Sequence, residues 1–88
     1  MIAPYRSTPI FDEATIPAGL RRDHSTKAGV WGLIRILEGR LRVDYESGAS
    51  RILSEGETGL IQPEEKHRVE PLGRVRMQVD FYDRLPQP

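Results

Sequence analysis

The chain has 88 residues, of which 13 are basic and 13 are acidic, and it contains no cysteine. A chain of this length forms one small domain, so we expect residues 1–88 to fold as a unit. The balanced charge, with no basic patch, argues against nucleic acid or a charged membrane surface as the main partner. The absence of cysteine excludes disulfides and thiolate chemistry.

Neither the apolar segments nor the first residues indicate a membrane or a secretory route. No apolar run approaches the roughly 18 residues that span a bilayer. Residues 1–6 lack the apolar core of a signal peptide. We therefore expect a cytoplasmic protein.

Glycines and prolines divide the chain into short segments, and few stretches between them exceed ten residues. This spacing favours strands over helices. Residues 12–15 fit at most one helical turn, which Pro17 would end. Residues 33–37 and 41–45 are predicted as two strands, and the residues between them, Glu38-Gly39-Arg40, as the loop of a hairpin.

The second half of the chain continues the same pattern. Residues 51–53 fit a short strand, and residues 75–81 alternate most clearly, with Val75, Met77, Val79 and Phe81 on one face. About seven or eight short strands without room for a crossover helix predict an all-β fold. The candidates are a β-sandwich, an SH3-like or OB barrel, and a cupin-like jelly-roll barrel of short antiparallel strands, which we favour.

The only two histidines decide between these barrels. His24 precedes the strand at 33–37, and His67 follows the turn that contains Pro63. Cupin barrels place their site histidines in this way, after a strand, a glycine turn and a proline-containing turn. His24 and His67 are therefore predicted as metal ligands.

Five motifs follow one another from about residue 5 to residue 82. They are Ser7-Thr8-Pro9-Ile10-Phe11, Leu20-x3-His24-x-Thr26-Lys27-x-Gly29-Val30-Trp31-Gly32, Leu37-Glu38-Gly39-Arg40-Leu41, Pro63-x3-His67-Arg68-Val69-Glu70 and Asp80-Phe81-Tyr82. Together they resemble the small cupin-like domain at the amino end of the tellurite-resistance protein TehB, which also occurs alone in YeaR-like proteins. The resemblance implies a jelly-roll barrel, a divalent metal and a link to tellurite or nitrosative stress. Longer relatives carry a methyltransferase that this chain is too short to hold, so methyl transfer is not implied.

The metal site predicted from the resemblance is incomplete. Cupins usually supply a His-x-His pair and a carboxylate from the first motif, but Thr26 stands at the position of the second histidine. Neutral imidazole suits Zn, Ni, Fe or Mn. Weaker candidates for a further ligand are Glu64, Glu70 and Asp80.

Strand alternation limits these replacements. If His67 points inward, Glu70 points outward and joins the site only through a bulge. Asp80 lies on the face opposite the apolar row at 75–81, so it is excluded if that row faces the interior. Glu64 lies on a turn that can bend inward.

Two further residues are candidates for ligand binding. Lys27 would attract an oxyanion such as tellurite, nitrite or a carboxylate, although a solvated lysine is an equally good reading. Trp31 would line a pocket, or belong to the core or a dimer contact. Thr26 belongs to the same group.

We expect a homodimer, because a chain this short has little core of its own. Three function classes remain open. The first is a metal-binding or small-molecule-binding protein of stress response. The second is a metal-dependent enzyme of the oxygenase or isomerase type, and the third is a structural dimerisation module without a site.

Overall fold

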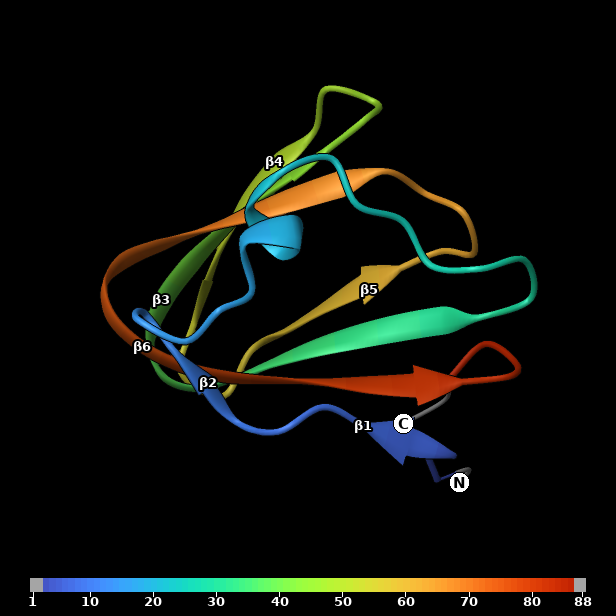
Figure 1. The fold of residues 1–88 in the computed structure, drawn as a ribbon, viewed down its shortest axis with the longest axis horizontal. Coiled ribbons are helices and arrows are strands. Elements are labelled where there is room, and N and C mark those ends of the chain that lie inside the picture. The colour runs from blue at the N-terminus through green and yellow to red at the C-terminus, as the bar shows by residue number, and fades with distance from the viewer. Residues whose placement is uncertain (1–2, 87–88) are drawn as a thin grey trace.

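The computed structural model describes residues 3–86, which form one antiparallel β-sheet of six strands (Figure 1). Two strands are long and four are short. Along the hydrogen-bonded path the order is β1-β6-β3-β4, with β2 also paired to β6 and β5 to β3. The strands are β1 (Arg6–Ser7), β2 (Phe11–Asp12), β3 (Trp31–Tyr45), β4 (Ser50–Ser54), β5 (Thr58–Ile61) and β6 (His67–Tyr82).

The long strands β3 and β6 pair with each other over almost their whole lengths and bend together (Figure 1). The first part of β3 pairs with the last part of β6 and with β5. The last part of β3 pairs with the first part of β6 and with β4. The bend therefore folds one sheet into two half-sheets that face each other, as in a barrel.

The predicted hairpin at Glu38-Gly39-Arg40 is wrong, because these residues lie inside β3. Gly39 has φ of +76°, and the register between β3 and β6 shifts on both sides of it. It is the bulge at which the strand bends. A Cβ atom at this position would lie 1.9 Å from the carbonyl oxygen of Arg74, so only glycine fits. Fusing the two predicted strands is one reason why the described residues form six strands and not seven or eight.

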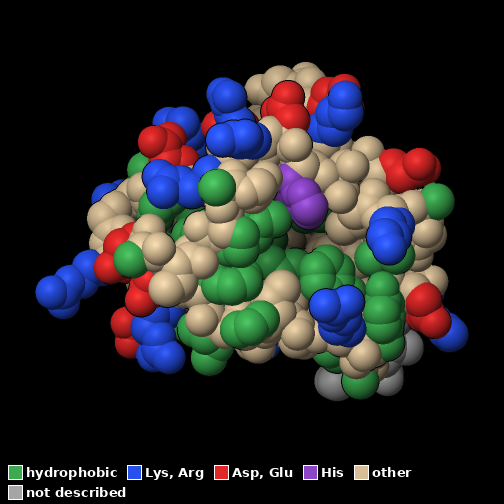
Figure 2. All heavy atoms as spheres, viewed as in Figure 1, with side chains coloured by type: hydrophobic (Ala, Val, Ile, Leu, Met, Phe, Trp, Pro, Cys, Tyr) green, Lys and Arg blue, Asp and Glu red, His purple; other side chains and the backbone are tan. Residues whose placement is uncertain are grey.

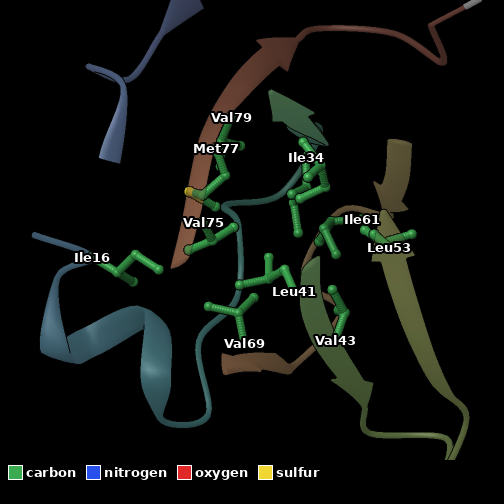
Figure 3. Close-up of a cluster of buried hydrophobic side chains, with 11 residues drawn as sticks. Ile16, Ile34, Leu41, Val43, Leu53, Ile61, Val69, Val75, Met77 and Val79 are labelled. Atoms are coloured by element: carbon green, nitrogen blue, oxygen red, sulfur yellow. The ribbon is translucent and has the colours of Figure 1, made fainter. Parts of the chain in front are cut away.

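The core fills the space between the half-sheets. Alternate residues of β3 and β6 point into it, as the sequence pattern predicted for Val75, Met77 and Val79. Figure 3 shows these side chains converging from opposite strands. The buried cluster is Ile16, Ile34, Ile36, Leu41, Val43, Leu53, Ile61, Val69, Val75, Met77 and Val79.

The segment before β3 runs across one open end of the barrel. It begins with a turn at Asp12, whose carboxylate accepts hydrogen bonds from the backbone N–H groups of Ala14 and Thr15. The 3-10 helix η1 (Ala18–Arg21) follows after Pro17. An isolated antiparallel bridge between His24 and His67 fastens the segment to the start of β6. Within residues 3–86, no helix is long and apolar enough to cross a membrane. The all-β prediction is confirmed.

Candidate functional site

A pocket opens at the end of the core that the His24 segment crosses. The space in it that the centre of a water molecule can occupy is about 40 Å³. This is below the roughly 300–1,000 Å³ of sites that hold a whole drug-sized ligand, so the pocket has room for a very small molecule or for one end of a longer one. Figure 2 shows a histidine at the edge of a hollow surrounded by hydrophobic side chains. The lining is mostly apolar and consists of Thr8, Leu20, His24, Thr26, Gly32, Ile34, Ile61, His67, Val69, Met77, Val79 and Phe81.

The structure brings the two predicted histidines together at this pocket. Their ring centroids lie 5.7 Å apart, and the rings meet edge to face with an interplanar angle of 80°. Each backbone N–H donates to the carbonyl of the other residue at 2.8 Å. His24 is exposed, whereas His67 is only 5% exposed. One ring therefore lies at the mouth and the other on the pocket wall.

A ring hydrogen bond of His67 shows which of its two nitrogens carries the proton. Its Nδ1 lies 3.0 Å from the carbonyl oxygen of Glu65, and because a carbonyl only accepts, Nδ1 carries the proton. Burial lowers the pKa of His67 below its usual 6.5, an effect that the Glu65 carbonyl opposes and the His24 ring increases. The ring is therefore neutral near pH 7, with Nε2 as its acceptor or metal-binding atom.

The second ring nitrogen of His67, Nε2, has no hydrogen-bond partner within residues 3–86, and His67 is one of the residues that line the pocket. Every buried side-chain nitrogen and oxygen in this part of the chain has a partner. An unpartnered Nε2 must accordingly be accessible. A backbone carbonyl on the other nitrogen is also the arrangement that orients metal-binding histidines.

Thr26 lines the pocket but has a structural role as well. Its hydroxyl donates to the carbonyl of Val30 at 2.8 Å and accepts from the backbone N–H of Glu64 at 3.2 Å. It therefore ties the His24 segment to the turn before His67. Glu64 itself is exposed with φ of +62°, and its side chain does not line the pocket.

The structure does not bring the other two weaker candidates to the histidines. Glu70 points outward and pairs with Arg42. Asp80 is buried, but on the opposite face of β6, where it accepts hydrogen bonds from Arg35 and Ser7 at 2.7 Å each. Both placements follow the alternation read from the sequence.

The two ligand-binding candidates beyond Thr26 lie in different places. Lys27 is exposed at the outer part of the mouth, beside His24 and Phe81. Trp31 is half-buried and opposite Tyr82 in the β3–β6 register. Because Gly32 and Ile34 point inward, Trp31 belongs to the outer face and not to the pocket.

The side chains near the pocket offer too few ligands for a metal site in which protein alone coordinates the ion. Within residues 3–86, no group of three or more His, Cys, Asp or Glu side chains could hold a metal ion. Catalytic zinc sites use three protein ligands and structural sites four. His24 and His67 offer two nitrogens, so an ion here would need water or a bound molecule to complete its coordination.

The sequence reading missed the apolar side chains that form the pocket wall and the arginine at its mouth. Met77, Val79 and Phe81 were recognised as sharing one face of a strand, but nothing local showed that this face borders a cavity. Arg6 reaches the mouth because β1 pairs with the end of β6, with Arg6 opposite Phe81. That pairing joins opposite ends of the chain and leaves no local pattern.

Comparison with known proteins gives the family. The TehB-like domain matches residues 6–79. The chain belongs to the TehB-like family. The sequence is 31% identical over 74 residues to a probable S-adenosyl-L-methionine-dependent methyltransferase TehB from Haemophilus influenzae. The match covers 77% of this chain but only 26% of that relative, so the chain spans about a quarter of its length.

Solved structures share the TehB-like fold. The crystal structure of TehB from Haemophilus influenzae has a TM-score of 0.80 at 28% identity, covering 89% of this chain and 30% of that chain. A protein from Escherichia coli K12 has a TM-score of 0.85 at 22% identity, covering 96% and 91%. Fe(II) HppE has a TM-score of 0.65 at 12% identity, covering 83% and 40%. The cupin-like fold is thus confirmed, and the resemblance to YeaR-like proteins stays a prediction.

Proposed function

We propose that this TehB-like protein is a small-molecule-binding protein of the cupin type, with its ligand in the pocket beside His24 and His67. The observation that carries the proposal is the free Nε2 atom of a neutral, buried His67 at the wall of an otherwise apolar pocket. Small-molecule sites combine an apolar lining with a few placed polar groups in this way.

A divalent metal ion is the second candidate occupant, held by the two imidazoles with water or a small molecule in the other positions. The supporting observation is that Fe(II) HppE, an iron protein solved also with substrate, has the same fold. The hydrogen bond from Nδ1–H of His67 to the Glu65 carbonyl fixes the ring, as in histidines that bind Zn, Ni, Fe or Mn through Nε2. The link to tellurite that the resemblance implies adds a bare oxyanion as a third kind of occupant to test.

Thermal unfolding tests the proposal with protein purified without a histidine tag. Organic acids, alcohols, tellurite and divalent ions are added singly, and an occupant of the pocket raises Tm because only the folded state binds it. We expect His67→Ala to abolish the rise and His24→Ala to reduce it. Glu70→Ala, which alters the same strand on its outer face, is the matched control and should leave the rise unchanged.

Two results would overturn the proposal. One is that no compound raises Tm, and the other is that the rise is the same in the His24→Ala/His67→Ala double variant. Either would leave the histidines as structural residues of the barrel. Turnover of the bound compound would instead place the protein among enzymes.

A further inference from the structure

We infer that the ligand of the pocket is a small organic anion, such as a carboxylate, with an apolar body. This inference rests on the proposed function and names the class of ligand. Its basis is the distribution of charge and apolar surface over three connected hollows around His24.

The three hollows adjoin one another, because His24 and Phe81 line all three. The inner one is the pocket already described, lined by His24, Thr8 and Phe81 among others. A second hollow, lined by Arg6, Thr8, His24 and Phe81, opens toward β1 and η1. A third, lined by Arg6, His24, Lys27 and Phe81, opens toward the loop before β3. Figure 2 shows basic and acidic side chains on the face that carries the histidine, with hydrophobic side chains around the hollow itself.

The mouth is positively charged because its lining includes basic residues and no acidic ones. No Asp or Glu side chain lines any of the three hollows, although the chain has as many acidic as basic residues. Arg6 and Lys27 line the outer part, and neither forms a salt bridge within residues 3–86. An anionic group is therefore favoured at the mouth, and a cation is disfavoured.

The inner wall excludes a bare, strongly hydrated ion as the whole ligand. Ile34, Ile61, Val69, Met77 and Val79 surround the space behind the histidines. An inorganic oxyanion would lose its hydration there without gaining hydrogen bonds. An apolar body gains free energy by leaving water, and the cationic side chains of Arg6 and Lys27 at the mouth remain for the anionic end.

The test is a series of NMR titrations of the whole protein, following the backbone amides of Gly32 and Val69 at the pocket. The probes are acetate, butanoate, hexanoate, hexanol, inorganic phosphate and tellurite. We expect affinity for the carboxylates to rise about fourfold per added CH₂ until the pocket is filled. Hexanoate should bind at least about fivefold more tightly than hexanol at low salt, and this difference should shrink as salt is added.

The variant that isolates the charge is Arg6→Ala with Lys27→Ala. It should weaken hexanoate at least about fivefold and leave hexanol unchanged. The matched control is Arg40→Ala with Arg74→Ala, which removes two exposed positive charges outside the three hollows and should change neither. Because all four side chains are exposed, neither pair should affect folding.

Each result that differs from these expectations overturns one part of the inference. Equal affinity for hexanol and hexanoate, or an unaffected Arg6→Ala/Lys27→Ala variant, removes the anion from the inference and leaves the pocket as a binding site. Phosphate or tellurite binding as tightly as hexanoate removes the apolar body. If no probe shifts the pocket amides, the inference fails, and so does the proposed small-molecule site.

Discussion

The backbones of His24 and His67 hold each other through two hydrogen bonds of 2.8 Å, independently of their rings. This bridge positions both imidazoles at the pocket while leaving the rings free for a ligand. Because a backbone bridge does not depend on the side chain, alanine at either position should keep the segment in place. Loss of binding in those variants can therefore be attributed to the ring.

Protonation of His67 should reduce stability in mildly acidic solution. Burial places its folded-state pKa below the unfolded value near 6.5, so the unfolded state takes up a proton first as pH falls. The free energy of unfolding should be highest above pH 6.5 and should fall from there toward the lowered folded-state pKa. Urea unfolding between pH 7.5 and 5 measures this slope.

The control for the pH effect is His67→Gln, which should flatten the slope in that window, whereas His24→Gln should retain most of it because His24 is exposed. A wild-type free energy of unfolding that rises as pH falls through 6.5 would contradict the burial argument.

Asp80 is predicted to matter for stability and not for the site. Its side chain is 7% exposed and pairs with Arg35 on the face of β6 away from the pocket. Asp80→Ala should lower the free energy of unfolding by about 2–3 kcal/mol, less than for a fully buried pair because Arg35 can be rehydrated. Ligand affinity of the folded protein should not change.

Glu70→Ala is the control for Asp80→Ala. The ion pair of Glu70 with Arg42 is exposed, so its loss should lower the free energy of unfolding by about 0.5 kcal/mol or less. A loss of ligand affinity in Asp80→Ala, measured below its unfolding transition, would return Asp80 to the list of site residues.

Gly39 should be the least replaceable glycine of the barrel. Gly39→Ala combines positive φ with a steric clash against the backbone of Arg74, and we expect a loss of about 3 kcal/mol or more. Gly29 has nearly the same φ, +77°, but open space around it. Gly29→Ala should therefore cost only about 1–2 kcal/mol, the strain of φ alone. Equal losses in chemical denaturation would show that the bend tolerates a side chain.

The homodimer expected from the small size of the chain stays a prediction. Light scattering at tens of micromolar should give twice the mass of the 10.0 kDa chain. A monomer mass at that concentration would show that the barrel is stable without a partner.

Side-chain direction could be predicted from the sequence because it follows from strand geometry. From the period of two, an inward His67 implied an inward Val69 and an outward Glu70, and Asp80 was expected on the face opposite Val79; the structure has His67 and Val69 inward and Glu70 and Asp80 on the other face. The two histidines met as the family resemblance implied, at 5.7 Å between centroids.

The bend at Gly39 could not be predicted in the same way. A glycine with positive φ suits both a hairpin loop and a bulge, and the partner strand decides between them. That partner, β6, contains Pro71 and Gly73, which in sequence also indicate turns. The lining of the pocket mouth could not be predicted for a related reason. Arg6, Lys27 and Phe81 line the same hollow only because strands far apart in the sequence pair with each other.

The most direct test of the central claim is an NMR spectrum of the imidazole ring nitrogens, which shows only the two histidines of this chain. At pH 7.5 we predict that His67 is neutral with its proton on Nδ1, and that added hexanoate or a divalent ion shifts its Nε2 resonance with saturation. A proton on Nε2, or a His67 resonance unchanged by every probe that raises Tm, would contradict the claim that this ring forms the binding site.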